Sequence, residues 1–319
     1  MTIHGPARSL LLILTRRSVP RIEASVPAVG CDDADVANGN DERALVAGAF
    51  DQIGELEWER LDATLAGRVS FEQHRRWLDR HHVRGRVLEI GAGAGRFTVE
   101  LVEAGCQVAV ADISSGQLAL NRQHVAAAGA SDGVESWTRA DVCDLPADWQ
   151  GGFDAVVAYG GVLSYVFDAA DVAVRQCLQA LAPGGVVVGS VMSLAGNARL
   201  HVNEIAALAS GDALDAVDRL VRDGDQRVIG ATGVAAFRHF TLRRLTATIE
   251  SAGGQLLDVA ASNWLSLTDS AAVHQLEQHD GRGWAWLLDA EEAMCRESGT
   301  VEGGTHMLFA ARSANDPPT

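Results

Sequence analysis

The stretch Leu88–Phe97, LEIGAGAGRF, places three glycines directly after a short apolar run. Gly91, Gly93 and Gly95 alternate with alanines, and a glycine-rich turn of this kind lets a ligand approach the backbone closely. The apolar residues before the turn, in 86–90, predict a buried strand. A strand that ends in such a loop is typical of α/β folds that hold a nucleotide-like ligand at the carboxyl ends of their strands.

Short apolar strands alternate with helical patterns on both sides of this stretch. The predicted strands are 86–90, 107–112, 134–141, 153–161, 186–192, 255–260 and 305–312. The predicted helices are 44–61, 70–82, 96–104, 115–127, 171–181, 241–254, 270–278 and 283–294. This alternation predicts a doubly wound, mostly parallel seven-stranded sheet with helices on both faces.

The periodicity divides the chain into one domain and two tails. Residues 1–42 mix Pro, Gly, Asp and Asn and predict a disordered tail, and 314–319 form a second tail. Residues 43–313 read as a single domain. Within it, the alternation is interrupted at 194–235 by an alanine-rich amphipathic pattern, which predicts a helical insertion that caps the ligand site.

Composition narrows the class of partner. The net charge is −16 and every basic residue other than histidine is arginine, which disfavours binding to nucleic acid or to an anionic membrane. The apolar run 9–15 is too short for a membrane span. The five cysteines are scattered and contain no Cys-x-x-Cys pair, which predicts reduced thiols in a cytoplasmic protein and no metal site.

The spacing of the glycines indicates which ligand the loop holds. A dinucleotide loop has the form Gly-x-Gly-x-x-Gly, whereas here Arg96 stands where the third glycine would be. Glu89 precedes the first glycine by two residues and would repel a pyrophosphate. The loop therefore favours a positively charged ligand without phosphate. An NAD-dependent oxidoreductase, an alternative hypothesis for this loop, is disfavoured by both Arg96 and Glu89.

The segment 87–101, VLEIGAGAGRFTVEL, resembles the first motif of class I (seven-stranded) S-adenosylmethionine-dependent methyltransferases. The later segments 153–166, 181–193, 237–259 and 303–312 resemble that family's following motifs in order, so the resemblance covers about 43–313. It implies S-adenosylmethionine as the cofactor. In this interpretation Asp112 ends the second strand, where an acid accepts the ribose hydroxyls, although NAD enzymes carry an acid there too.

The resemblance also implies roles for individual residues. Backbone at the first glycines lies against the methionine part of the cofactor, a carboxylate orients it, an arginine meets its carboxylate, and residues after strands two and three hold adenine. The backbone positions are Gly91, Ala92 and Gly93, the carboxylate is Glu89, and the arginine is Arg68. The adenine residues are Ile113, Asp141 and Val142. The alternatives are a simple tight turn for the glycines, helix caps for Asp112 and Asp141, and a solvated arginine for Arg68.

Methyl transfer needs an acceptor held in line with the methyl group and, for some acceptors, a base. Tyr159, at the end of the fourth strand, is expected beside the methyl group, with its backbone on the cofactor and its ring on the acceptor. His239 and His201 are the candidate bases, with a packing or surface role as the alternative for each.

The sequence thus predicts methyl transfer to oxygen, nitrogen or carbon of a small molecule in bacterial secondary metabolism. A rival hypothesis is a protein of the same fold that binds S-adenosylmethionine or S-adenosylhomocysteine without transferring methyl. No nucleic acid or membrane partner is expected, and a homodimer is left open.

Overall fold

The protein is described here by a computed structural model that covers residues 39–210, 213–233, 236–268, 270–278 and 281–316. The predicted tail before residue 39 and the final three residues lie outside this range. The first described helix, α2 (Gly39–Ile53), begins ahead of the predicted domain start at residue 43.

A seven-stranded sheet forms the centre of the fold, in the order β3-β2-β1-β4-β5-β7-β6. The strands are β1 (Arg86–Ile90), β2 (Gln107–Asp112), β3 (Val134–Arg139), β4 (Phe153–Ala158), β5 (Leu181–Met192), β6 (Gly254–Ala261) and β7 (His306–Ser313). Strands β1 to β5 pair in parallel, whereas β7 runs antiparallel to both β5 and β6. The predicted seven-stranded, mostly parallel sheet is present, and it is a mixed sheet because two of its pairings are antiparallel.

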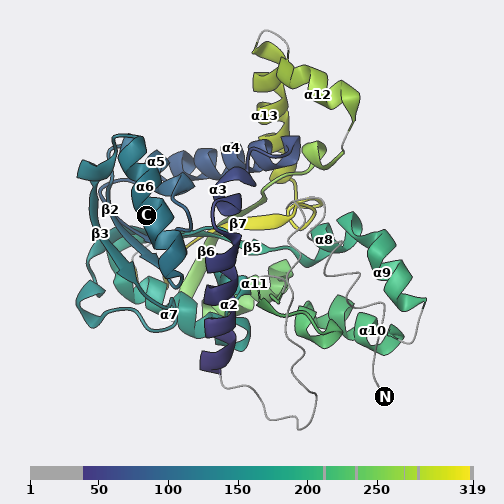
Figure 1. Ribbon diagram of the computed structural model, residues 1–319, viewed down its shortest axis with the longest axis horizontal. Helices are drawn as coiled ribbons and strands as arrows, with labels where there is room; N and C mark the ends of the chain where they lie inside the picture. Colours follow the sequence, from purple (N-terminus) through teal and green to yellow (C-terminus); the bar gives the residue numbers. More distant parts are fainter. Residues whose placement is uncertain (1–38, 211–212, 234–235, 269, 279–280, 317–319) are drawn as a thin grey trace.

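Helices cover both faces of the sheet because its central strands contribute apolar side chains to two separate cores (Figure 1). On one face lie α4 (Leu65–Arg80), α5 (Arg96–Glu103) and α6 (Ser115–Ala127). On the other lie α7 (Ala170–Ala180) and α11 (Leu242–Ser251), whose Val174 and Ile249 pack against the sheet. Ser114 caps α6 by accepting a hydrogen bond from the Gln117 N–H at 3.0 Å, as its sequence predicts.

The predicted helix over 44–61 is divided. Gly54 adopts a left-handed φ of 55° and ends α2, and the short α3 (Leu56–Glu59) follows. This break lets α2 turn across the carboxyl ends of β2 and β3, and residues 57–61 reach the glycine loop.

The predicted insertion contains α8 (Leu194–Leu200), α9 (Val202–Ala209), α10 (Leu214–Asp223) and the 3-10 turn η5 (Gln226–Ile229). Figure 1 shows α8, α9 and α10 grouped beside α2 and α11. The chain returns from this insertion at Phe240, whose N–H donates to Met192 O at the end of β5. The insertion is therefore anchored at the carboxyl edge of the sheet.

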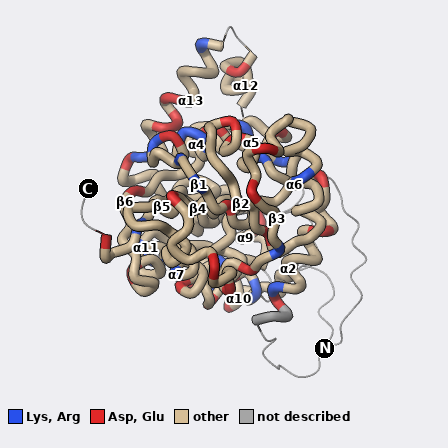
Figure 2. Tube along the Cα trace, turned by 90° about the vertical axis from the view of Figure 1, so that its left-hand side faces the viewer, with Lys and Arg blue, Asp and Glu red and all other residues tan. Residues whose placement is uncertain are grey.

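A second helical pair, α12 (Ala271–Gln278) and α13 (Arg282–Cys295), joins β6 to β7. Leu287 and Leu288 of α13 pack against Leu65 and Val69 of α4. Figure 2 shows arginine and acidic positions interspersed along α4, α5 and α13. No helix in the described part of the chain is long and apolar enough to span a membrane.

Candidate functional site: a glycine loop between two buried acids

The loop after β1 has the backbone that a close ligand needs. Gly91, Gly93 and Gly95 have φ values of 66°, 53° and 99°, a region that other residues rarely adopt. A Cβ at Gly91 would stand 2.3 Å from Cγ2 of Val162, so that position has no room for a side chain. A Cβ at Gly93 would have no neighbouring atom closer than 3.6 Å, which leaves a recess above the backbone.

A pocket of about 420 Å³, counting the part open to solvent, lies along this loop. Its lining combines the loop, the end of β4 and the segment after α2. The lining residues are Glu57, Arg60, Leu61, Glu89, Ile90, Gly91, Ala92, Gly93, Ala94, Arg96, Phe97, Tyr159 and Gly160. The structure therefore brings together the predicted Glu89, Gly91, Ala92, Gly93 and Tyr159.

Glu89 is a buried carboxyl group at the inner end of this pocket. Its side chain is only 3% exposed and accepts a hydrogen bond from the Thr98 hydroxyl at 2.6 Å. Burial raises the pKa of Glu89 from 4.5 to about 8, more than the Thr98 hydrogen bond lowers it. A cation that enters the pocket would favour the ionised carboxylate.

Asp112 is the second buried acid. Its Oδ2 accepts from the Gly93 N–H and its Oδ1 from the Ser114 N–H, both at 2.8 Å. Burial raises the pKa of Asp112 to about 6 despite these two donors. Since each carboxylate oxygen can accept more than one hydrogen bond, Asp112 shapes the loop and keeps acceptor capacity for a ligand hydroxyl.

Gln117 also faces the loop, whereas its sequence pattern, Ser114-x-x-Gln117, indicated only the start of a helix. Its amide nitrogen Nε2 donates to Phe50 O and Gly54 O, whereas Oε1 is buried without a hydrogen-bond partner among the described residues. Oε1 lies 3.9 Å from the position that a Cβ of Gly93 would take. A buried unpaired acceptor is costly, and a donor group of a ligand at the loop would satisfy it. These residues fit a hydroxyl-bearing, positively charged ligand.

Helix α2 covers the ends of β2 and β3, where the resemblance places the adenosine. Asp51 accepts from the Gly116 N–H at 2.8 Å, and Arg43 pairs with Asp141 at 3.1 Å. Asp141 also accepts from the Cys143 N–H. The neighbouring Val142 is buried in the core. The predicted adenine contacts thus lie beneath α2, and the role of each stays a prediction.

The predicted carboxylate ligand Arg68 does not line the pocket. Its guanidinium pairs with Glu277 of α12 at 2.5 Å and donates to Asp62 O at 2.6 Å. Two other arginines do line it. Arg60 is held by Glu57 at 2.7 Å, and Arg96 pairs with Asp62. Arg60 follows a short N-terminal helix, and no sequence pattern indicated it. Its approach to the loop depends on the break in the helix at residue 54.

Tyr159 lies under α4 at the pocket's edge. It is 4% exposed, and its hydroxyl donates to His74 O at 3.0 Å. Burial raises the pKa of the Tyr159 phenol well above 10.0. This hydroxyl is therefore committed to the protein backbone and is poorly suited to receive a proton from an acceptor.

The predicted bases lie at the base of the helical insertion. His239 is 5% exposed, its Nδ1 faces Gly224 O at 3.1 Å, and burial lowers its pKa to about 4. His201, which ends α8, acts electrostatically on His239. Within the described ranges, no group of His, Cys, Asp or Glu side chains is arranged to hold a metal ion.

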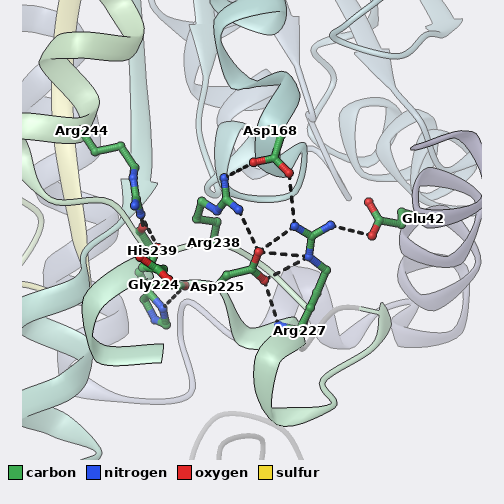
Figure 3. Close-up of polar contacts among 9 residues, drawn as sticks. Glu42, Asp168, Gly224, Asp225, Arg227, Arg238, His239 and Arg244 are labelled. Atoms are coloured by element: carbon green, nitrogen blue, oxygen red, sulfur yellow. Dashed lines mark hydrogen bonds and ion pairs between the residues drawn. The ribbon is translucent and has the colours of Figure 1, made fainter. Parts of the chain in front are cut away.

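An ion-pair cluster, made of Glu42, Asp168, Asp225, Arg227 and Arg238, joins the insertion to α2 and to the loop before α7. Figure 3 shows that Asp225 and Asp168 each bridge the two arginines, with Glu42 on the outer side of Arg227. Burial opposes ionisation of Asp225, but the arginine hydrogen bonds outweigh it and hold its pKa below 3.8. The cluster ties the insertion to α2 and to the turn before α7.

Comparison with known proteins identifies the domain. The sequence model of a family described as "Methyltransferase domain" matches residues 88–187. A demethylmenaquinone methyltransferase of Clavibacter sepedonicus is 35% identical over 103 residues, 32% of this chain and 39% of the relative. A ubiquinone biosynthesis O-methyltransferase of Bordetella pertussis is 32% identical over 173 residues, 54% of this chain and 66% of the relative. Residues 88–187 thus match a methyltransferase domain, and the chain is similar to class I S-adenosylmethionine-dependent methyltransferases, although it spans less than two thirds of the length of these two relatives.

Solved methyltransferase structures share the fold over most of the chain. The CcbJ methyltransferase from Streptomyces caelestis is 17% identical, with 83% of this chain and 98% of that chain covered and a TM-score of 0.55. A Burkholderia thailandensis 1,6-didemethyltoxoflavin-N1-methyltransferase, solved with S-adenosylhomocysteine, is 16% identical, with 93% and 99% covered and a TM-score of 0.53. The methyltransferase-domain match indicates S-adenosylmethionine as the cofactor of this domain.

Proposed function

We propose that this methyltransferase transfers the methyl group of S-adenosylmethionine to a small molecule. The observation that carries the proposal is the pair of buried acids, Glu89 and Asp112, on either side of a glycine loop that also faces the unpaired Oε1 of Gln117. This set offers negative charge and hydrogen-bond acceptors to a ligand. A cationic adenosine thioether suits such a pocket, whereas a diphosphate would meet two carboxylates.

Each residue of the pocket has a role in this proposal. Gly91, Ala92 and Gly93 bring backbone against the methionine part of the cofactor, and Glu89 receives its ammonium group. Asp112 accepts from the ribose. Around the adenine, Ile113 packs on the ring, Asp141 meets the amino group and the Val142 N–H meets the ring. The carboxylate role predicted for Arg68 passes to Arg96, which lines the pocket.

The cofactor supplies an activated methyl group when it is bound. The protein then has to hold the acceptor in line and keep water out. The helical insertion is anchored beside the end of β4 by the Arg238 N–H, which donates to Ser164 O at 2.8 Å. We therefore place the acceptor between the β4 loop and the insertion.

The acceptor is a small molecule in this proposal, methylated at oxygen, nitrogen or carbon in bacterial secondary metabolism within the cytoplasm. The similar proteins include an O-methyltransferase of ubiquinone biosynthesis and a 1,6-didemethyltoxoflavin-N1-methyltransferase. Both acceptors are small molecules. Because these two enzymes methylate different atoms, the proposal includes oxygen, nitrogen and carbon as the methylated atom.

The test is label transfer from methyl-labelled S-adenosylmethionine to a panel of phenols, amines and carbon acids, with the full chain as the enzyme. The proposal predicts labelled product with at least one acceptor class and formation of S-adenosylhomocysteine. Tight binding of S-adenosylhomocysteine without label transfer to any acceptor would instead support the binding protein that transfers no methyl.

A further inference from the structure

Three histidines from distant parts of the chain converge near the proposed acceptor position. His74 lies in α4, His239 follows the insertion, and His306 begins β7. The ring centroids of His74 and His306 are 6.3 Å apart. Both His74 and His239 lie close enough to lower the pKa of His306 electrostatically. The inference below rests on the proposed methyl transfer and concerns which of these rings meets the acceptor.

The antiparallel direction of β7 brings His306 to the ligand edge of the sheet. His306 pairs with Met192, the last residue of β5. The first residue of a parallel strand would lie at the opposite edge, far from the glycine loop. Strand topology therefore places this residue next to the carboxyl end of β5, the strand adjacent to β4.

Hydrogen bonds distinguish the three rings. Nδ1 of His74 faces Ser70 O at 2.7 Å, and Nδ1 of His239 faces Gly224 O at 3.1 Å. Because a carbonyl oxygen only accepts, both rings carry their proton on Nδ1, and both are 5% exposed. His306 differs because it is partly exposed. Its Nδ1 lies 3.2 Å from Thr305 Oγ1, and no other hydrogen bond to its ring occurs among the described residues.

An aromatic wall, made of Phe50, Tyr165 and Phe237, stands beside these histidines. The ring of Tyr165 contacts Phe50 at 5.4 Å and Phe237 at 5.8 Å between centroids, and Phe237 contacts His239 at 4.9 Å. All three side chains keep partial exposure rather than closing into the core. Edge-to-face aromatic surfaces of this kind suit a planar, aromatic acceptor.

Arg60 connects the aromatic wall to the cofactor pocket. It lines the pocket, and one guanidinium nitrogen lies 3.9 Å from the position that a Cβ of Gly160 would take, in the loop after β4. Its positive charge acts on both Tyr165 and His306. Glu57 holds its Nε at 2.7 Å. A negative oxygen on the acceptor would be stabilised here.

We propose that His306 is the proton acceptor for a planar aromatic molecule with an acidic hydroxyl, of phenolic or enolic type, whose oxygen lies between His306 and Arg60. Burial, followed by the charges of His74, Arg60 and His239, lowers the pKa of His306 to about 3, so the ring is neutral near neutral pH and is a weak base. An imidazole of such low basicity requires an acidic hydroxyl and a cation beside the developing oxyanion.

The step balances within the proposed reaction. The hydroxyl proton passes to a ring nitrogen of His306 while an electron pair of the oxygen forms the new bond to the methyl carbon. The pair of the breaking sulfur–methyl bond stays on sulfur, which gives the neutral thioether. The protonated imidazole then returns its proton to solvent.

The test compares His306→Gln with the wild type and with His82→Gln as a matched control. His82 is exposed and precedes β1, at the opposite edge of the sheet. Label transfer is measured with phenol, catechol, para-nitrophenol and a hydroxynaphthoquinone, and binding of S-adenosylhomocysteine is measured by titration. We expect H306Q to bind S-adenosylhomocysteine as the wild type does and to lose about 10²–10⁴-fold in kcat. H82Q is expected to match the wild type.

A readout beyond loss of rate separates proton transfer from packing. The defect of H306Q should shrink as pH rises and as the acceptor hydroxyl becomes more acidic, because an ionised oxygen needs no base. An equal defect for every acceptor and at every pH would overturn the proposal, as would unchanged kcat in H306Q. Transfer by the wild type to amines alone would overturn it while leaving methyl transfer intact. Transfer to no acceptor class would overturn both.

Discussion

Replacing Glu89 by glutamine should change how cofactor binding depends on pH. Glu89 is buried, and its pKa stands at about 8 in the protein without ligand. The ammonium and sulfonium groups of S-adenosylmethionine favour a carboxylate, so binding should drive a proton off this residue. Glu89→Gln keeps the shape of the side chain and an oxygen to accept from Thr98, but it has no proton to release.

The magnitude follows from the position of that pKa. At about pH 7 roughly one Glu89 in ten is ionised, and ionising the rest costs about 1.4 kcal/mol. The wild type should therefore bind S-adenosylhomocysteine roughly tenfold more tightly at about pH 9 than at about pH 7 from this group alone. At about pH 9, E89Q should bind about 1–3 kcal/mol more weakly than the wild type, because it lacks the charge.

The same shift predicts a stability effect of defined sign. Glu89 holds its proton in the folded state up to about pH 8, whereas the unfolded chain releases it near pH 4.5. Its stabilising contribution is thus present below pH 4.5 and is lost as pH rises toward 8. Unliganded wild type should lose stability relative to E89Q across this window, by up to about 5 kcal/mol.

Titration calorimetry in buffers of different ionisation enthalpy measures the protons released on binding. The ligand's own amino group also titrates, so the difference between wild type and E89Q isolates Glu89. We expect the wild type to release nearly one more proton than E89Q near neutral pH. Equal proton release and parallel pH profiles in the two proteins would refute the assignment of Glu89 to the cationic end of the ligand.

Three further tests, two of them with a matched control variant, address separate parts of the site and the fold. Asp112→Ala should weaken S-adenosylhomocysteine binding by about 1–3 kcal/mol in a titration, and unchanged affinity in a folded variant would show that the ribose lies elsewhere. Gly91→Ala and Gly151→Ala share a φ of 66°, but only the Gly91 site lacks room for a Cβ. In denaturant unfolding, each variant should lose about 1–2 kcal/mol of unfolding free energy because of its backbone conformation. G91A alone should lose more and bind S-adenosylhomocysteine poorly, and equal effects in the two variants would contradict the tight contact between Gly91 and Val162. Asp225→Asn should lower the free energy of unfolding by about 2 kcal/mol, whereas Asp171→Asn, at an exposed i,i+4 pair, should change it by less than about 0.5 kcal/mol; equal losses would show that the ion-pair cluster does not fix the insertion.

Short sequence patterns predicted much of the fold. The strand 86–90 and the helix 115–127 are found at their predicted bounds, because buried apolar runs and a serine cap are signals within a few residues. The helix 171–181 ends at Ala180, ahead of the Pro-Gly-Gly cluster, since β5 already begins at Leu181. A local breaker marks the neighbourhood of a boundary but not its residue.

Contacts between distant segments were beyond the sequence patterns. His306 approaches the ligand edge because β7 runs antiparallel, and Arg60 approaches the loop because the chain breaks at Gly54. Neither residue stands in a motif. Arg68 is the opposite case. Its sequence position suggested a contact with the cofactor carboxylate, but its guanidinium donates to Glu277 of α12, more than two hundred residues away.

Calorimetric titration of the full chain with S-adenosylhomocysteine tests the central claim most directly, with NADH as the comparison ligand. We predict saturable one-to-one binding of S-adenosylhomocysteine that Asp112→Ala weakens, and no comparable binding of NADH. Absence of binding by a folded chain, or a preference for NADH, would contradict the assignment of the glycine loop to a cationic, phosphate-free adenosine.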